Sequence, residues 1–292
     1  MRQLVRTRKF RLILLAAIAA AGVVVPVTIA TSASAVSGLV VVTATSPERG
    51  SESFKGANAV CPAGTLILGG GADIVGGGHG VQLGGLNPAP SGMPANSMWA
   101  TANEDGPGHG GSWYITAWAI CASGVTGHEI VQASSAEPPD STFASATATC
   151  PAGKKVIGAG GISAGKPSYV LDTVDITSDL NSVYVETIAA ESPTPGTAPL
   201  AQAYAICIVP VRGQQLVRAT SGLTSADKSL SVSCPSGKRL HGTGGGMTGA
   251  IGQAHLDMLA PNGSRSSRIE AREDATGYSG TWRVDVYGVC AN

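Results

Sequence analysis

The hydrophobic positions of this chain fall in short runs separated by glycine, proline, serine and aspartate, without the sustained 3.6-residue period of amphipathic helices. These runs are rich in valine, isoleucine, threonine, tryptophan and tyrosine, and they include residues 38–45, 99–102, 114–121, 183–189, 201–208 and 282–290. Residues 282–287 alternate, with Arg283 and Asp285 on one face, which is typical of a half-buried strand. The pattern predicts an all-β protein.

The same landmarks recur three times in the same order. Each copy opens on an apolar strand, continues with Cys-Pro-Ala/Ser-Gly, four residues and Gly-x-Gly, and closes on an aromatic strand that ends in cysteine. We therefore divide the mature chain into repeats at 36–126, 127–212 and 213–292, each with roughly five or six strands.

The predicted fold is three homologous antiparallel β repeats packed as a β-prism-like unit with pseudo-threefold symmetry. Three small β-sandwiches in tandem are the alternative. Connections of only about five residues between the copies favour close packing.

The Gly-x-Gly of each copy predicts backbone at which no side chain fits. Positive φ angles, a β-bulge, or the close approach of another chain segment would each explain it. A phosphate-binding loop would need a following helix, and the sequence downstream is β-like.

Residues 1–35 have the pattern of an export signal. Basic residues up to Arg11 precede an apolar stretch at 12–30, and Ala-Ser-Ala at 33–35 predicts cleavage before Val36. An uncleaved anchor is the alternative. The mature chain would carry fourteen Lys and Arg against nineteen Asp and Glu, a formal charge of −5, and no basic tract. We therefore expect a secreted, extracellular protein that binds neither nucleic acid nor, after cleavage, a membrane.

The six cysteines form one pair per repeat, with spacings of 60, 57 and 56 residues, and an oxidising compartment predicts three disulfides. The repeat favours Cys61–Cys121, Cys150–Cys207 and Cys234–Cys290. A circular pattern of Cys121–Cys150, Cys207–Cys234 and Cys61–Cys290 is the alternative. Zinc is disfavoured, because no Cys-x-x-Cys or Cys/His ligand spacing is present.

Acidic residues recur in each copy just after a predicted strand and before a loop, and they are the main candidates for binding. Glu104, Glu191 and Glu273 align, Asp105 and Asp274 follow two of them, and carboxylates at three equivalent sites suit calcium or sugar hydroxyls. The simpler interpretation is a solvated strand end. Asp172, Asp175 and Asp179 add a further calcium hypothesis without the EF-hand spacing.

Tryptophan and histidine residues are further candidates for ligand contacts. Trp99 and Trp113 are candidates for stacking on sugars, whereas Trp118 aligns with Tyr204 and Tyr287 and is expected in the core. His79 and His109 lie in glycine-rich loops and are candidate metal ligands, although polar loop tips are the simpler interpretation.

The motif from the first cysteine to Gly-x-Gly and the closing aromatic-x-aliphatic-Cys strand resemble modules of uncharacterised secreted bacterial proteins. The three-copy Cys-Pro-x-Gly pattern is also loosely similar to the vitelline membrane outer layer protein I family. That resemblance implies a β-prism of Greek-key sheets, and sugar or matrix binding without catalysis.

The expected function is therefore a secreted binding or structural protein that catalyses no reaction, with a glycan or a cell-envelope component as its partner and no cofactor other than calcium. No Gly-x-Ser-x-Gly or His-Glu-x-x-His cluster is present. A secreted hydrolase with an unrecognised site and a protease inhibitor are the alternatives.

Overall fold

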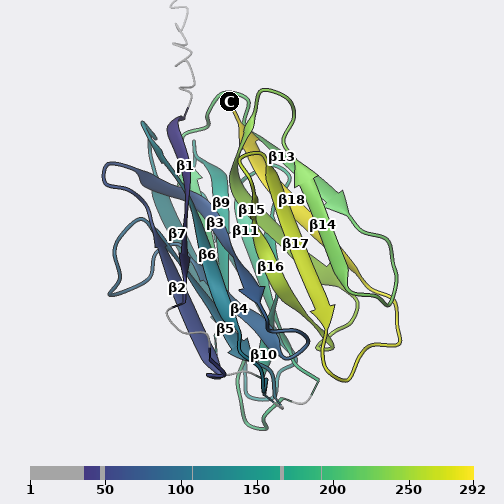
Figure 1. Ribbon diagram of the computed structural model, residues 1–292. Helices are drawn as coiled ribbons and strands as arrows, with labels where there is room; N and C mark the ends of the chain where they lie inside the picture. The colour runs from purple at the N-terminus through teal and green to yellow at the C-terminus, as the bar shows by residue number, and fades with distance from the viewer. Residues whose placement is uncertain (1–35, 47–49, 107, 165–167, 192) are drawn as a thin grey trace, which may run out of the picture. The chain divides into compact units, whose positions relative to one another are not determined.

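The computed structural model describes residues 36–46, 50–106, 108–164, 168–191 and 193–292, which belong to one compact unit (Figure 1). The predicted export signal lies outside these residues. The described residues form 18 strands and no helix. No helix in this part of the chain is therefore long and apolar enough to span a membrane.

Each predicted repeat contributes six strands. The first holds β1 (Ser37–Thr45), β2 (Phe54–Val60), β3 (Leu66–Val75), β4 (Val81–Asn87), β5 (Ser97–Glu104) and β6 (Tyr114–Ser123). The second holds β7 (Glu129–Ala136), β8 (Phe143–Thr149), β9 (Lys155–Ala164), β10 (Tyr169–Ile176), β11 (Ser182–Ala189) and β12 (Leu200–Ile208). The third holds β13 (Gln215–Thr220), β14 (Lys228–Ser233), β15 (Arg239–Thr248), β16 (Ala254–Asn262), β17 (Ser266–Glu273) and β18 (Arg283–Ala291).

The strands form three six-stranded antiparallel sheets, and every sheet is shared by two repeats. Their orders are β1-β6-β3-β16-β17-β14, β13-β18-β15-β10-β11-β8 and β7-β12-β9-β4-β5-β2. Each sheet thus joins the first, sixth and third strands of one repeat to the fourth, fifth and second strands of another. The predicted all-β fold with three homologous repeats in a pseudo-threefold arrangement is confirmed, and the exchange of strands is the feature that the sequence did not predict.

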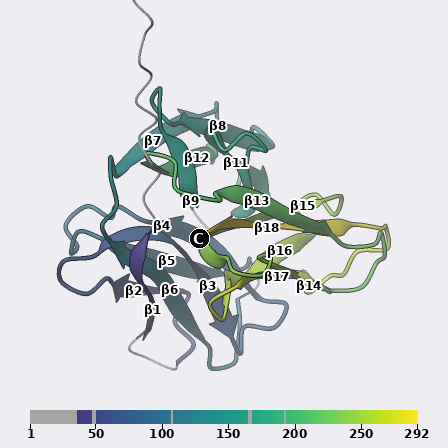
Figure 2. The same ribbon diagram turned by 90° about the horizontal axis from the view of Figure 1, so that it is seen from above.

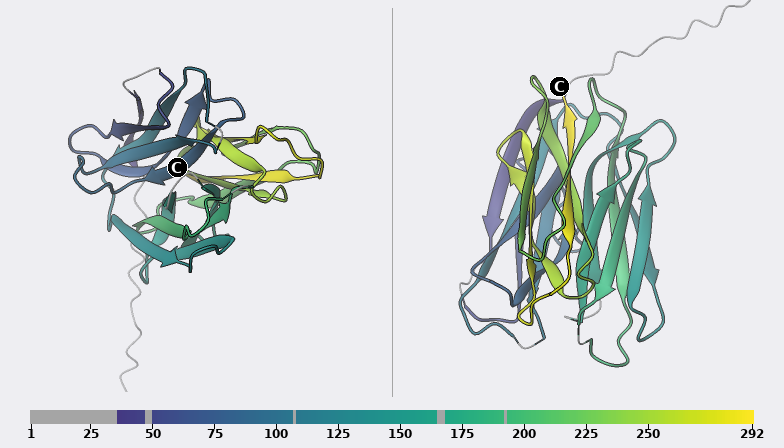
Figure 3. Two further views of the ribbon diagram at one scale, coloured as in Figure 1. Left: turned by 90° about the horizontal axis from the view of Figure 1, so that it is seen from below. Right: turned by 90° about the vertical axis from the view of Figure 1, so that its right-hand side faces the viewer.

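Within a repeat the two three-stranded halves pack face to face, so that each repeat is also a small sandwich. The inner faces are rich in buried alanine, as in the first repeat at Ala57, Ala59, Ala100, Ala102, Ala117 and Ala119. Figure 2 shows the three repeats as lobes around a common axis, and Figure 3 shows the same lobes from the opposite end. Small side chains allow two sheets to approach closely, which accounts for a core with few aromatic residues.

Glycines of the three repeats meet at this axis. A Cβ atom on Gly69 would lie 2.7 Å from the Cα of Gly242, one on Gly242 would lie 2.6 Å from the Cα of Gly158, and one on Gly158 would lie 2.8 Å from the Cα of Gly69. These are the first glycines of the three Gly-x-Gly motifs. The three backbones therefore close a ring that has no room for a side chain.

Register shifts occur immediately before each of these glycines, in the pairing of β3 with β6, of β9 with β12 and of β15 with β18. The Gly-x-Gly motif thus marks both a β-bulge and a close approach, two of the three explanations that the sequence offered. The second glycine of each motif lies against the neighbouring repeat, and a Cβ on Gly71 would come within 2.6 Å of the Cα of Ala260.

Each repeat contains one disulfide, which links its two cysteines. The disulfides join Cys61 to Cys121, Cys150 to Cys207 and Cys234 to Cys290, each with a Cα–Cα distance of 5.7 Å. This is the pairing that the repeat favoured, and the circular alternative is wrong. Three disulfides are typical of proteins in an oxidising environment.

Candidate functional site

Two of the predicted binding residues hold buried tryptophans in place. Glu104 accepts a hydrogen bond from Trp113 Nε1 at 3.0 Å, and Glu273 accepts one from Trp282 Nε1 at 3.1 Å. Trp113 is completely buried, so the prediction of an exposed stacking surface at this residue is wrong. The ring is held inside by its hydrogen bond to Glu104 and by contact with Lys55, whose Nζ lies 4.9 Å from the ring centre.

The third repeat has the same arrangement, and the second repeat has lost it. Lys228 Nζ lies 4.0 Å from the Trp282 ring centre. By strand register, the positions of Lys, Glu and Trp in the second repeat hold Ala144, Ala189 and Pro199. Tyr169 fills this end of the second repeat instead, and its hydroxyl lies within hydrogen-bond distance, 3.1 Å, of the carbonyl oxygens of both Ser141 and Thr197.

Glu191 is therefore not equivalent to Glu104 and Glu273, and the three predicted equivalent sites do not exist. Glu191 follows β11 and accepts hydrogen bonds from Thr276 Oγ1 at 2.8 Å and from Gln253 Nε2 at 3.1 Å, both in the third repeat. Its role in the structure is a contact between repeats.

Three of the predicted acidic residues, one from each repeat, do approach one another. Burial raises the pKa of Asp105, and the nearby carboxylates of Asp274 and Glu191 raise it further. Thr276 Oγ1 links two of the carboxylates, because it lies 2.8 Å from both Glu191 Oε2 and Asp274 Oδ1. Even so, no group of three or more His, Cys, Asp or Glu side chains in the described ranges is arranged to hold a metal ion.

The two predicted histidine ligands lie in neighbouring loops. His79 is exposed, and its Nδ1 lies 2.8 Å from the carbonyl oxygen of Glu273. His109 is half-buried and packs against Gly80 and Gly111. Each ring thus contacts backbone of the surrounding loops.

The outer faces of the three sheets are the surfaces on which side chains differ most between repeats. We call them the 2/3 face (β13-β18-β15-β10-β11-β8), the 1/3 face (β1-β6-β3-β16-β17-β14) and the 1/2 face (β7-β12-β9-β4-β5-β2) after the repeats that share each sheet. Trp99 lies half-buried on the 1/2 face, over Gly56, which has no Cβ to obstruct the ring. Of the two tryptophans predicted to bind sugar, it alone keeps an accessible surface.

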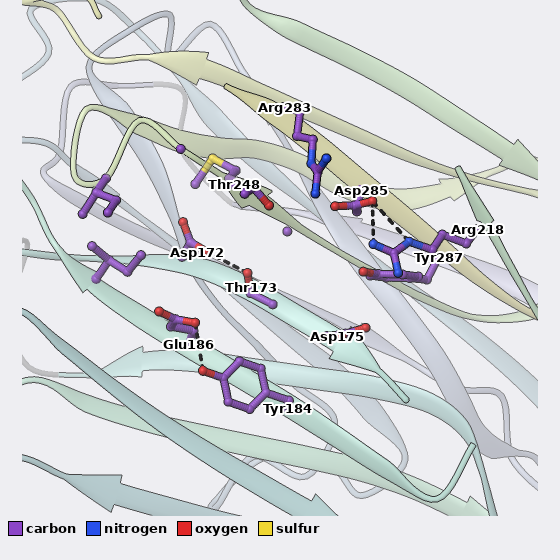
Figure 4. A pocket seen from close by; sticks show the side chains of 15 residues that line it. Asp172, Thr173, Asp175, Tyr184, Glu186, Arg218, Thr248, Arg283, Asp285 and Tyr287 are labelled. Atoms are coloured by element: carbon purple, nitrogen blue, oxygen red, sulfur yellow. Dashed lines mark hydrogen bonds and ion pairs between the residues drawn. The ribbon is translucent and has the colours of Figure 1, made fainter. Parts of the chain in front are cut away.

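A groove of about 410 Å³ crosses the 2/3 face where the second and third repeats meet (Figure 4). Its side chains come from β10, β11, β13, β15 and β18 and from the loop after β15. They are Asp172, Thr173, Asp175, Tyr184, Glu186, Ile188, Arg218, Met247, Thr248, Ile251, Arg283, Asp285 and Tyr287. A second hollow of about 500 Å³ continues the groove beyond Asp175, Arg218 and Tyr287.

One wall of the groove carries an ion pair between Arg218 and Asp285, in which the two charges cancel. Arg218 Nη2 donates to Asp285 Oδ1 at 2.8 Å, and its guanidinium lies 5.1 Å from the centre of the Tyr287 ring. Asp175 and Tyr287 line the groove beside this ion pair. Burial raises the pKa of Asp175 and of Tyr287, although Arg218 opposes both shifts. These bonds fix donors and acceptors in place before any ligand arrives.

The opposite wall carries carboxylates without a cation. Asp172 is 6% exposed, and burial raises its pKa to about 7, with a further contribution from Glu186. Its hydrogen bond comes from Thr173 Oγ1 to Oδ2 at 2.7 Å. Glu186 Oε2 accepts a hydrogen bond from the Tyr184 hydroxyl at 2.8 Å. Figure 4 shows both acidic groups beside the hollow.

The 1/3 face has the same backbone and different chemistry. Its hollow of about 400 Å³ is lined by Leu39, Val40, Val41 and Trp118 together with Arg239, Gly263 and Ser264. Trp118 is half-buried, contrary to its expected place in the core, whereas its equivalents Tyr204 and Tyr287 are buried. An apolar surface thus replaces the tyrosine, aspartate and arginine of the 2/3 face.

Sequence reasoning found part of this groove. Asp172 and Asp175 were candidates and both line it, whereas Asp179 lies outside it, in an exposed turn where it accepts a hydrogen bond from Thr177 Oγ1. Arg283 and Asp285 were expected on one face and both line it. Glu186, Tyr184 and Arg218 were missed, because only the strand exchange brings the second and third repeats into one sheet.

A scan against models of known protein families gives no match, and a search of curated proteins gives no significant match. The fold and the grooves are therefore the basis for assigning a function.

Proposed function

We propose that this protein is secreted and binds carbohydrate through the groove on the 2/3 face without catalysing a reaction. The observation that carries the proposal is an open groove of about 410 Å³ with hydrogen-bonding side chains on both of its walls. The leader-like sequence of residues 1–35 and the three disulfides support export to the cell exterior.

The groups in the groove match the chemistry of sugars. Sugar hydroxyls donate to carboxylates and accept from guanidinium groups, and the groove has both, with Asp172, Asp175 and Glu186 facing Arg218 and Arg283. The half-buried ring of Tyr184 adds a flat apolar surface of the kind on which sugar C–H groups pack. Continuation of the groove past Asp175 suits a chain of several sugar units.

A glycan array probed with the mature, disulfide-bonded protein tests the proposal, followed by calorimetric titration of each ligand that binds. Tyr184→Ala is expected to weaken binding at least tenfold. Trp99→Ala is the matched control, because Trp99 occupies the position of Tyr184 on the 1/2 face, and it should leave the affinity unchanged. Absence of glycan binding, or binding unaffected by Tyr184→Ala and by Arg218→Ala, would reject the proposal.

A second candidate is hydrolysis of a glycosidic bond, and Asp172 is the observation that favours it. Glycoside hydrolases pair a carboxylic acid of raised pKa with a second carboxylate, and Asp172, with a pKa of about 7, lies close to Glu186. Release of new reducing ends from the glycans that bind, abolished by Asp172→Asn, would support this function. Intact glycans after prolonged incubation would exclude it for those glycans.

A further inference from the structure

The bulge of the fourth strand carries an aspartate in two repeats. Register shifts place Asp172 in β10 and Asp257 in β16 at the same position, and Gly84 in β4 is the third equivalent. The facing residues are also equivalent, because Thr173 pairs with Glu186 and Met258 pairs with Glu270. The 2/3 face and the 1/3 face therefore present the same pair of carboxylates.

On the 1/3 face the chain itself supplies the counter-charge. Arg272 Nε donates to Asp257 Oδ2 at 3.0 Å, and Arg272 Nη2 lies 3.8 Å from Glu270 Oε2. Arg268 makes a second ion pair with Glu270. A guanidinium group thus lies between the two carboxylates.

On the 2/3 face both arginines are replaced. Ile188 stands at the position of Arg272, and Tyr184 stands at the position of Arg268. No lysine or arginine in the described part of the chain pairs with Asp172 or Glu186, and the second oxygen of Asp172 has no hydrogen bond there. Ile188, which is 8% exposed, lines the groove at the position that Arg272 has on the 1/3 face. Figure 4 shows the groove beside Asp172 and Glu186.

We infer that the ligand itself brings the missing cation, and that the groove selects amino sugars with a free amine over their neutral, N-acetylated forms. This inference rests on the carbohydrate-binding function proposed above. A protonated amine between Asp172 and Glu186 would take the place that the guanidinium of Arg272 has on the 1/3 face. Tyr184 and Ile188 flank Glu186 on the same strand face, and the half-buried ring of Tyr184 provides apolar surface for the sugar ring.

The test compares oligomers of glucosamine with oligomers of N-acetylglucosamine of the same length, by calorimetric titration at neutral pH. The amine form is expected to bind at least tenfold more tightly, with a preference that decreases as salt is added. Glu186→Gln should remove most of the preference. Glu270→Gln, the same change at the equivalent site that Arg272 and Arg268 neutralise, is the matched control and should leave binding unchanged.

A second variant supplies the cation within the chain. Ile188→Arg copies the 1/3 face and should abolish binding of the amine oligomer, while circular dichroism and thermal unfolding show that the protein is folded. If Ile188→Arg does not fold, Asp172→Asn serves the same purpose, because it removes the charge with little change of shape.

The outcomes separate this inference from the function on which it rests. Equal or tighter binding of the acetylated oligomer would overturn the amine preference and leave carbohydrate binding intact. Binding of an arginine-containing peptide that is sensitive to Glu186→Gln, without binding of either sugar, would overturn both and identify a peptide ligand. Failure of all carbohydrates and of the peptide would also overturn both.

Discussion

The three repeats each place a glycine at the threefold axis and carry different residues on the three outer faces. At the axis a Cβ atom on Gly69, Gly158 or Gly242 would lie within 2.8 Å of the Cα of another of the three. On the faces, the position that holds Ile188 in one sheet holds Arg272 in another and Asn103 in the third.

The difference follows from the space at each place. A Cβ at the axis would overlap backbone of the next repeat, and backbone cannot yield as a flexible side chain can, so only glycine is compatible with the ring. On the outer faces one position can hold side chains of different size and charge without a change in strand pairing, as Ile188, Arg272 and Asn103 show. The axis therefore fixes the fold, and the faces are free to take different chemistries.

The largest effect is expected at the axis. Gly158→Ala places a methyl group against the backbone of Leu68 and Gly69, and we expect it to lower the free energy of unfolding by more than about 4 kcal/mol or to prevent folding. Chemical denaturation followed by tryptophan fluorescence measures this. Gly222→Ala, at a site with open space around it, should change stability by less than about 0.5 kcal/mol. Similar losses in the two variants would contradict the role of the ring.

The next effect concerns the ion pair of the 1/3 face. Arg272→Ile copies the 2/3 face and leaves Asp257, which is 2% exposed, without its cation. We expect a loss of about 3 kcal/mol at pH 8, less than for a fully buried pair because Arg272 is partly exposed. The loss should shrink toward pH 4, because burial already raises the pKa of Asp257 to about 6 and removal of Arg272 raises it further. A loss independent of pH would show that the pair is not its cause.

Substitution of Asp172 should have a smaller effect on stability, and it should stabilise the protein at high pH instead of destabilising it. Its folded-state pKa of about 7 exceeds the usual value of 3.8, so the unfolded chain releases the proton first and stability falls as the pH rises between these values. Asp172→Asn removes that dependence. The variant should match the wild type near pH 4 and be more stable by at least about 2 kcal/mol at pH 8. Denaturation curves across this range provide the test, and a variant less stable at pH 8 would refute it.

The smallest expected loss of stability is at the ends of the repeats that Trp282 and Tyr169 close. Trp282→Phe removes the hydrogen bond to Glu273 and weakens the contact with Lys228, and it should cost about 1 kcal/mol. Tyr169→Phe removes the hydroxyl that closes the same end of the second repeat and should cost about as much. Thermal unfolding of both variants checks this, and a neutral Tyr169→Phe would show that the second repeat is closed by other contacts.

Much of the fold was predictable because its signals are local. Strand composition, the threefold order of landmarks and the cysteine pairs each lie within one repeat. The exchange of strands was not, because the junctions involve only two residue pairs each, such as Gly85 with Ile162 and Leu86 with Gly161. Nothing in the local pattern distinguishes a strand that pairs within its own repeat from one that pairs with the next.

The site was harder to predict for a related reason. The sequence around Glu104 and Trp113 is typical of an exposed strand end, and their contact with each other and with Lys55 is formed only in the fold. The second repeat lacks Lys, Glu and Trp together, and this joint absence is the one sign in the sequence that the three contact one another. The carboxylates of the 2/3 face could not be judged from composition, since what sets Asp172 apart from Asp257 is a single arginine on the neighbouring strand.

Strand exchange also closes the three copies into a circle. Each repeat leaves one half-sheet to be completed by the next, and the pairing of β3 with β16 returns from the last copy to the first. Residues 124–128 and 209–214 span the gap between successive copies, and the end of β18 faces the start of β1 across the equivalent gap. The circle has no intrinsic beginning, and a circularly permuted chain starting at β7 would build the same three sheets.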